Sequence, residues 1–137
     1  KNDYPITVLR GHSISEVIVS SREIGFTGIG EPDIILALAD EGVERRKNTI
    51  RQAKTDCLIV REKGVSLPET AARIITFDSN VLGISNTQRA LTAVSLLVKH
   101  QSTLDMEMLR LGLKYRFTGE LREKTMGLVE RIASISD

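Results

Sequence analysis

The sequence has 137 residues, of which 41% are hydrophobic and 27% charged, and its formal net charge is +1 at pH 7. This length predicts one domain able to bury a core, and the near-neutral charge argues against nucleic-acid binding through a basic face. Aromatic residues make up only 4% and tryptophan is absent, which argues against a surface for stacking bases or sugars. No apolar run approaches membrane-spanning length, and residues 1–5 lack the pattern of a signal peptide.

Cys57 is the only cysteine. This chain alone therefore cannot form a disulfide or an iron–sulfur site, and a reducing compartment, the cytoplasm, is expected. Cys57 lies in an apolar segment with no base beside it in the sequence, so we expect it to pack in the core.

A polar corner followed by a predicted strand is the first candidate site. The corner, Arg10–Ser13, contains Gly11, which lets the backbone turn or approach a partner closely. Ile14–Ser20 is rich in β-branched residues and is predicted to be a strand. Glu16 lies on the face with the isoleucines of this strand, and an isolated buried carboxylate is costly. It therefore needs a partner such as Arg10 or an arginine of another chain, which predicts an interface.

His12 and Ser13 raise the possibility that the protein is a hydrolase. A serine nucleophile needs a base within hydrogen-bond reach and an acid that orients the base. Adjacent side chains of an extended segment point to opposite faces, so His12 and Ser13 point apart. His100 falls at the end of a predicted helix, where a cation suits the helix dipole. The spacing therefore does not support a catalytic triad.

Ser21–Glu31 is predicted to be a loop, and residues 28–30 read Gly-Ile-Gly, half of a dinucleotide-binding fingerprint. Such a turn must follow a strand and open a helix. Here Pro32 and another predicted strand follow, so the sequence argues against nucleotide binding by this turn.

The middle of the chain predicts a strand–helix–strand unit. Residues 32–39 form a nearly continuous apolar run, typical of a strand buried on both faces of a parallel sheet. Asp40 is expected to cap the next helix, whose sparse apolar side is marked by Val43 and Ile50. Residues 56–60 are the next strand, and the two strands should be parallel with a right-handed crossover.

A further strand, Ala72–Phe77, leads into the polar loop Asp78–Ser85. Ligands and partners of open α/β sheets gather where parallel strands end. This loop is therefore a second candidate region.

The last third of the chain is predicted to be helical. Asn86 is expected to cap a helix that runs to about His100. Ser102 and Asp105 stand three apart at the start of a second helix, as in a capping box. A third helix is predicted where apolar residues repeat at helical spacing over residues 121–135.

These patterns predict a single α/β domain over residues 1–137: a Rossmann-like open, mainly parallel sheet flanked by helices, with a helical C-terminal third. They single out no catalytic and no metal-ligating residue. Taken alone, the residues do not reveal a function.

The order and spacing of the segments resemble the gamma subunit, or gamma domain, of the 2-oxoacid:ferredoxin oxidoreductases. The matching features are Tyr4-Pro5 before Arg10–Ser13, the strand from Ser15 to Ser20, Pro32-Asp33 with the apolar strand to Leu38, Cys57–Val60, Ile74-Ile75, the helix opened by Asn86, and the closing pair of helices. The family's first strand and glycine-rich turn are absent here, so the match covers about the last three quarters of such a domain. Leu91-Thr92 stands where members often carry Leu-Gly.

The resemblance implies a structural component of a larger enzyme, with alpha, beta and delta or ferredoxin-like subunits as partners. That complex cleaves a 2-oxoacid such as pyruvate or 2-oxoglutarate with thiamine diphosphate, passes the acyl group to coenzyme A and sends electrons to ferredoxin through iron–sulfur clusters. This chain alone is expected to bind none of these cofactors. Association of this chain with further copies of itself, as a homo-oligomer, is also possible. The residues expected to face an interface or the active site are Arg10, Gly11, His12, Ser13, Ser15, Glu16 and Asn86.

The alternative from the residues themselves is a stand-alone α/β domain that binds a small molecule. It would use the loops Ser21–Glu31 and Asp78–Ser85.

Overall fold

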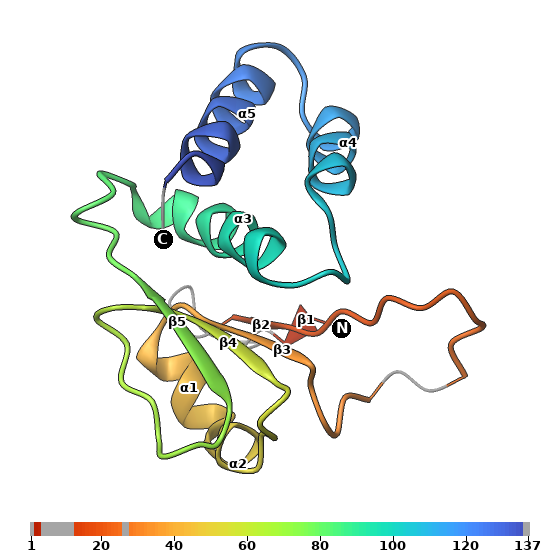
Figure 1. The fold of residues 1–137 in the computed structure, drawn as a ribbon, viewed down its shortest axis with the longest axis vertical. Coiled ribbons are helices and arrows are strands. Elements are labelled where there is room, and N and C mark those ends of the chain that lie inside the picture. The colour runs from red at the N-terminus through yellow and green to blue at the C-terminus, as the bar shows by residue number, and fades with distance from the viewer. Residues whose placement is uncertain (1, 4–12, 26–27, 136–137) are drawn as a thin grey trace.

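The computed structural model describes residues 2–3, 13–25 and 28–135, and a three-stranded parallel sheet lies at its centre (Figure 1). Helices α1 and α2 cover one face of the sheet, α3 lies on the other, and α4 and α5 pack beyond α3. The elements are β1 (Asn2–Asp3), β2 (Ile14–Ser15), β3 (Ile34–Ala37), α1 (Asp40–Arg45), α2 (Lys47–Arg51), β4 (Leu58–Glu62), β5 (Arg73–Phe77), the 3₁₀ helix η1 (Asn86–Gln88), α3 (Arg89–His100), α4 (Met106–Arg116) and α5 (Gly119–Ala133).

The sheet has the order β3-β4-β5, and both pairs of strands are parallel. In register, Leu58 of β4 lies between Ile34 of β3 and Arg73 of β5. A parallel pair of strands needs a crossover, and here α1 and α2 supply it between β3 and β4. The predicted α/β architecture with parallel strands is confirmed.

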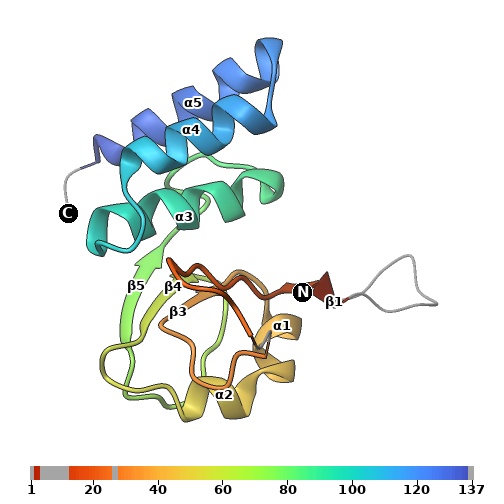
Figure 2. The same cartoon turned by 90° about the vertical axis from the view of Figure 1, so that its right-hand side faces the viewer.

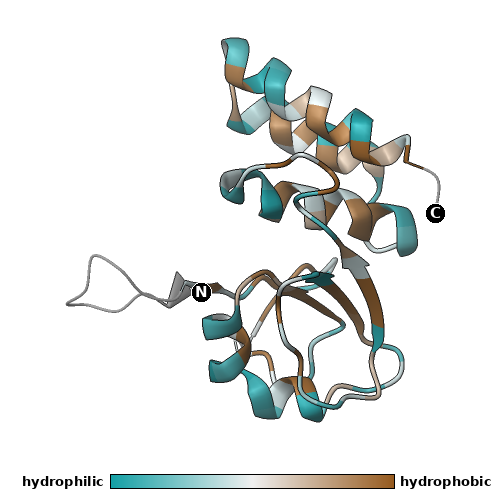
Figure 3. Cartoon of the chain, turned by 90° about the vertical axis from the view of Figure 1, so that its left-hand side faces the viewer, coloured by the Kyte–Doolittle hydropathy of each residue, from teal (hydrophilic) through white to brown (hydrophobic). Residues whose placement is uncertain are grey.

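Side chains alternate along the strands and so divide the core into two clusters. Cys57 and Ile59 point toward α1 and α2, where they form one cluster with Val43, Ile50 and Ala53. The other cluster lies under α3 and contains Leu58, Val60, Phe77, Ala93 and Leu97. Figure 3 shows the apolar colouring of the strands and of the helix faces that meet them.

The helix predicted after β3 is divided into α1 and α2 by Arg46, whose backbone is not helical (φ −111°, ψ 18°). Its predicted apolar residues, Val43 and Ile50, are buried as expected. Asp40 does not cap the helix, because Ala39 occupies the N-cap position. The Asp40 carboxylate instead accepts a hydrogen bond from the backbone N–H of Ser66 (2.8 Å), which holds the loop after β4.

Two other predicted helix starts are shifted by one to three residues. Ser85, not Asn86, precedes the first turn, and its backbone N–H donates to Gln88 Oε1 (2.9 Å) in a capping box. Asp105, not Ser102, caps α4, because its carboxylate accepts from the Met108 N–H (2.8 Å). The Asp105 carboxylate thus reaches a free N–H of the first turn, whereas at Ser85 the Gln88 side chain reaches back to the backbone N–H before the turn.

The strand predicted over Ile14–Ser20 is wrong beyond Ser15. Only β2 is in a ladder, antiparallel to β1. From Glu16 onward, no strand in the described part of the chain lies alongside to pair with the backbone, and Val17 and Val19 are 75% and 61% exposed. β-branched composition alone does not make a strand without a neighbour. Of the predicted corner Arg10–Ser13, residues 10–12 lie outside the described residues, and Ser13 is exposed.

The predicted C-terminal helices are confirmed, and α3 lies between the sheet and the other two (Figure 2). Helix α3 packs against α5, Thr92 and Ser95 of α3 are fully buried, and α5 buries Leu128, Val129 and Ile132. Among the described residues, no helix is long and apolar enough to cross a membrane.

Candidate functional site

The predicted interface residues do not gather into one cluster in the described part of the chain. Arg10, Gly11 and His12 lie outside the described residues. Ser13 and Ser15 are exposed, and Ser15 ends β2. Asn86 is exposed as the first residue of η1, which leads into α3 on the far face of the sheet from α1 and α2.

Glu16 has a partner within its own chain. Arg46, at the junction of α1 and α2, donates from its guanidinium to Glu16 Oε1 (2.8 Å), and both side chains are partly exposed. The partner expected from the sequence was Arg10 or an arginine of another chain. Because Arg46 satisfies the carboxylate, the charge of Glu16 is no argument for a second chain, and an interface at this corner stays a prediction.

A buried polar cluster, which sequence reasoning missed, lies where β4 and β5 end. Glu62 is 6% and Ser79 2% exposed, and Arg89 begins α3 beside them. Glu62 Oε2 accepts from the Gly64 N–H (2.6 Å), and Oε1 accepts from the Ser79 N–H (3.3 Å). The Arg89 Nε–H donates to Ser79 Oγ (3.2 Å). We call Glu62, Ser79 and Arg89 the edge cluster.

The charged form of Glu62 is favoured despite its burial. Burial raises the pKa of a carboxyl, but the hydrogen bonds from Gly64 and Ser79, together with the positive charge of Arg89, lower it by more. The net result is a pKa for Glu62 below its ordinary value of 4.5. Glu62 is therefore ionised near neutral pH and is unsuited to donate a proton there.

Around the edge cluster, charged groups hold the Asp78–Ser85 loop in place. Lys63 Nζ donates to Asp78 Oδ2 (2.9 Å), while Oδ1 accepts from the N–H groups of Asn80 and Val81. The hydrogen bond from Lys63 is the main reason why the pKa of Asp78 is lowered. Arg131 of α5 also donates to the Leu82 carbonyl (2.9 Å) and so fixes the loop to the helical layer.

At the carboxyl edge of the sheet, the polar groups of the edge cluster are thus hydrogen-bonded to one another or to the backbone. The Glu62 carboxylate contacts backbone N–H groups, and the hydroxyl of Ser79 accepts from a guanidinium, which is not a base that could activate it. The edge cluster therefore joins two strand ends to the start of α3. A sequence signal existed: Glu62 continues the period-2 series of buried positions Leu58 and Val60.

Two sequence interpretations about chemistry are confirmed. Cys57 is buried (2% exposed), and burial raises the pKa of its thiol, so it packs in the core. Residues 28–30 are followed by β3 and not by a helix, as the sequence predicted. Within residues 2–3, 13–25 and 28–135, no three His, Cys, Asp or Glu side chains are grouped to hold a metal ion.

Comparison with known proteins places the fold. No protein-family model matches the sequence, and no curated protein matches it either. The structure is similar to the crystal structure of the gamma subunit of a keto/oxoacid ferredoxin oxidoreductase from Geobacter sulfurreducens PCA, with a TM-score of 0.56. This chain shares the fold of that subunit.

The alignment covers 74% of this chain and 63% of that subunit, at 16% sequence identity. The chain therefore spans less than two thirds of the solved subunit. At this identity the likeness establishes the fold, and the fold predicted from the resemblance is confirmed.

Proposed function

We propose that this chain is a gamma-type component of a 2-oxoacid:ferredoxin oxidoreductase and serves assembly rather than self-contained catalysis. The single observation that carries the proposal is the fold shared with the keto/oxoacid ferredoxin oxidoreductase gamma subunit over 74% of the chain. The edge cluster agrees with a structural role, because its carboxylate, hydroxyl and guanidinium contact one another or the backbone.

The reaction proposed for the complex is the coenzyme A-dependent oxidative decarboxylation of a 2-oxoacid such as pyruvate or 2-oxoglutarate. Thiamine diphosphate would cleave the acid, and iron–sulfur clusters would carry electrons to ferredoxin. An iron–sulfur cluster is held by several cysteine thiolates, whereas this chain has only Cys57, which is buried in its core. Its residues do not fit a cluster, so we assign the clusters, thiamine diphosphate and coenzyme A to alpha, beta and delta or ferredoxin-like subunits. A lone reduced thiol agrees with a place in the cytoplasm.

The segment after β2 is the surface proposed to meet those subunits. Val17 and Val19 are 75% and 61% exposed, and neither belongs to a strand. Aliphatic side chains on an extended segment can be buried against a partner, and about 25 cal/mol is gained for each Å² of apolar area removed from water. A partner subunit would thus cover the two valines that the described chain leaves exposed.

Affinity purification from the native source tests the proposal. The tagged chain should copurify with thiamine-binding subunits, identified by mass spectrometry, and a Val17→Glu variant should lose them. Val81→Glu is the matched control, because Val81 is also an aliphatic residue with 80% of its surface exposed, in the loop after β5. A chain that elutes alone, in a preparation from which other complexes are recovered intact, contradicts the proposal.

A stand-alone binding domain remains the second candidate because the Asp78–Ser85 loop does lie at the carboxyl edge of the sheet. A ligand at a hundredfold excess over its Kd stabilises a protein by about 2.7 kcal/mol. Thermal unfolding with coenzyme A, nucleotides and 2-oxoacids therefore separates the two ideas. A rise in melting temperature of the isolated chain favours this candidate, and no change with any of them removes it.

A further inference from the structure

Helix α4 carries an apolar stripe on its outer surface. Met108, Leu111, Gly112 and Tyr115 follow one another at intervals of three, one and three residues, so they share one face of the helix. Met108 is 48%, Leu111 44% and Tyr115 87% exposed, and Gly112 is exposed as well. The opposite face carries Leu113, the helix's only buried residue. We call the four outer residues the α4 ridge.

An apolar groove runs along each side of the α4 ridge. The groove between α4 and α5 has a volume of about 420 Å³. Leu111 and Met126 are the apolar residues that line it, and the charged residues around them are Glu107, Arg110, Lys114, Arg122 and Glu123. The groove between α3 and α4 has a volume of about 400 Å³, and its walls include Met108, Gly112 and Val94. A ridge between two apolar grooves is a surface that accepts a second helix by ridges-into-grooves packing.

Charges flank the ridge in a defined order. Glu107 and Lys114 line the groove toward α5, with the acid near the start of α4 and the base near its end. Asp105 and Arg116 lie on the other flank in the same order, and Arg116 lines the groove toward α3. No ion pair joins Glu107 or Lys114 to another residue in the part of the chain that the structure describes.

We propose that the α4 ridge binds the α4 ridge of a second copy of this chain. The two helices would run antiparallel about a two-fold axis that passes between Arg110 and Leu111. Positions whose numbers are equally far from that axis then lie at the same height along the two helices, and those on the same flank meet. Glu107 faces Lys114 of the second copy, and Asp105 faces Arg116 of the second copy, each pair occurring twice by symmetry.

Charge complementarity is the reason for choosing a second copy as the occupant. Both flanks become complementary in one and the same register, as at the flanking positions of a coiled coil. Antiparallel helices also bring the positive end of one dipole near the negative end of the other. Gly112 near the centre has no side chain to hold the backbones apart, and a Cβ built there meets no atom within 4 Å in the single chain.

Sedimentation equilibrium of the whole chain tests this surface by a charge swap. The unchanged chain should form a dimer at tens of micromolar. Lys114→Glu places two glutamates opposite each other on one flank, twice, and should raise the dimer dissociation constant by about tenfold. Glu107→Lys should do the same with two lysines. The double variant Glu107→Lys, Lys114→Glu reverses both charges and should return the constant to within about threefold of the unchanged chain.

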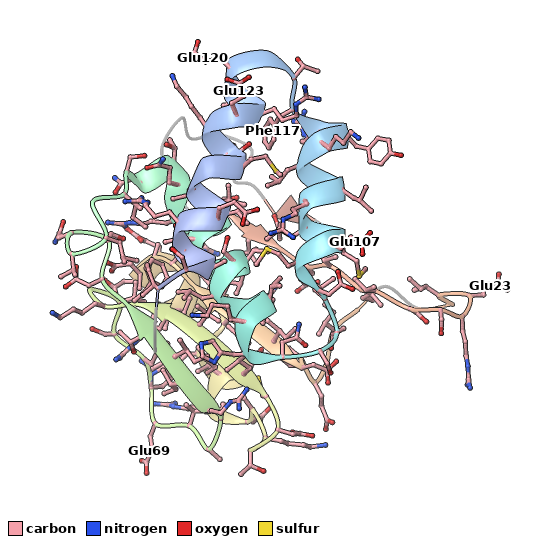
Figure 4. All side chains as sticks on the ribbon, turned by 45° about the horizontal axis from the view of Figure 1, so that its top comes forward. Glu23, Glu69, Glu107, Phe117, Glu120 and Glu123 are labelled. Atoms are coloured by element: carbon pink, nitrogen blue, oxygen red, sulfur yellow. The ribbon has the colours of Figure 1, made fainter. Side chains whose placement is uncertain are left out.

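Glu69→Lys is the matched control for Glu107→Lys, because it makes the same change of charge at an exposed residue far from α4 (Figure 4). It should leave the dissociation constant unchanged. A Gly112→Leu variant has room in the single chain, so circular dichroism should show the same helix content, while the dimer weakens.

The proposal is overturned if the unchanged chain is a monomer at these concentrations, or if the double charge swap fails to restore a dimer that the single changes break. If the chain is monomeric and Lys114→Glu releases a different protein from a copurified complex, the α4 ridge binds that protein and not a second copy. The proposal does not rest on the oxidoreductase role.

Discussion

Strand β4 and helix α4 are both rich in apolar residues, but those of β4 are buried and most of those of α4 are not. In β4, Leu58, Ile59 and Val60 are all buried between two parallel neighbours and two layers of helices. In α4, 11 residues long, only Leu113 is buried. The sheet unit thus completes its core within the chain, whereas α4 leaves apolar side chains exposed to solvent. Stability should therefore depend on β4, and association on α4.

The largest expected effect contrasts a residue of β4 with one of α4. Ile59 is 0% exposed, and Ile59→Ala should lower the free energy of unfolding by about 2–5 kcal/mol, because it removes buried methyl groups and leaves a cavity. Leu111→Ala, at a 44% exposed position, should cost less than about 1 kcal/mol. Urea unfolding at a low concentration, where the chain is monomeric, measures both. Equal losses would contradict the division between the two elements.

The edge cluster gives the next effect. Glu62→Gln keeps the shape of the side chain but replaces one accepting oxygen by an NH₂ group, which meets the N–H of Gly64 or of Ser79. The variant should lose about 1–3 kcal/mol, because a buried donor is left without an acceptor. Unfolding of Glu62→Gln at neutral pH, beside the exposed control Glu69→Gln, measures the loss. Two equally stable variants would show that the edge cluster does not join the strands.

The same residue predicts a pH dependence. The folded pKa of Glu62 lies below the unfolded value of 4.5. Its ionised form therefore stabilises the fold at every pH above about 4.5, and this contribution disappears as the pH falls through the lower, folded pKa. Stability of the natural chain should fall over this acidic range, and the Glu62→Gln variant should lose that part of the slope. An unchanged slope would mean that other carboxyls cause the acid sensitivity.

A smaller effect concerns the start of α4. Asp105→Ala should cost about 1 kcal/mol, because the Met108 N–H then loses the carboxylate that accepts from it. Ser102→Ala should cost almost nothing, although the sequence pattern gave Ser102 the capping role. Thermal unfolding of the two variants distinguishes these roles. A larger loss for Ser102→Ala would restore the interpretation from the sequence.

The smallest expected effect is that of the exposed pair Arg46–Glu16. A double-mutant cycle with alanine at both positions should give a coupling energy of about 0.2–1 kcal/mol, because both charges reach solvent. Chemical unfolding of the four proteins supplies the cycle. Coupling of zero would show that the Arg46–Glu16 pair does not hold the segment after β2.

The sequence was sufficient for the parts of the fold whose periodicity is unbroken. The apolar runs of β3 and β4 predicted parallel strands, and the helical spacing of apolar residues over 121–135 predicted α5; both are confirmed. It failed where the outcome depends on a neighbour far along the chain. Residues 16–20 have strand composition but no strand beside them in the described structure, so they stay outside the sheet. Arg46 lies 30 positions from Glu16, and nothing local indicates that pairing.

The candidate site shows the same limit. The edge cluster needs two strand ends and a helix start, so Ser79 and Arg89 could not be assigned to Glu62 from spacing alone. The position of Glu62 in the alternating series of β4 was visible, but not which groups would satisfy its charge. Helix caps depend on geometry at the scale of one residue, which explains why Asp105 and Ser85 replaced their neighbours.

Add-back of this chain to its proposed complex is the most direct test of the oxidoreductase role. The complex would be prepared from a strain that lacks the chain, and viologen reduction would be measured with a 2-oxoacid and coenzyme A, before and after the purified chain is added. Activity and the intact assembly should return together when the natural chain is added. Full activity of the complex without the chain, or no recovery when the folded chain is added, would contradict the oxidoreductase role.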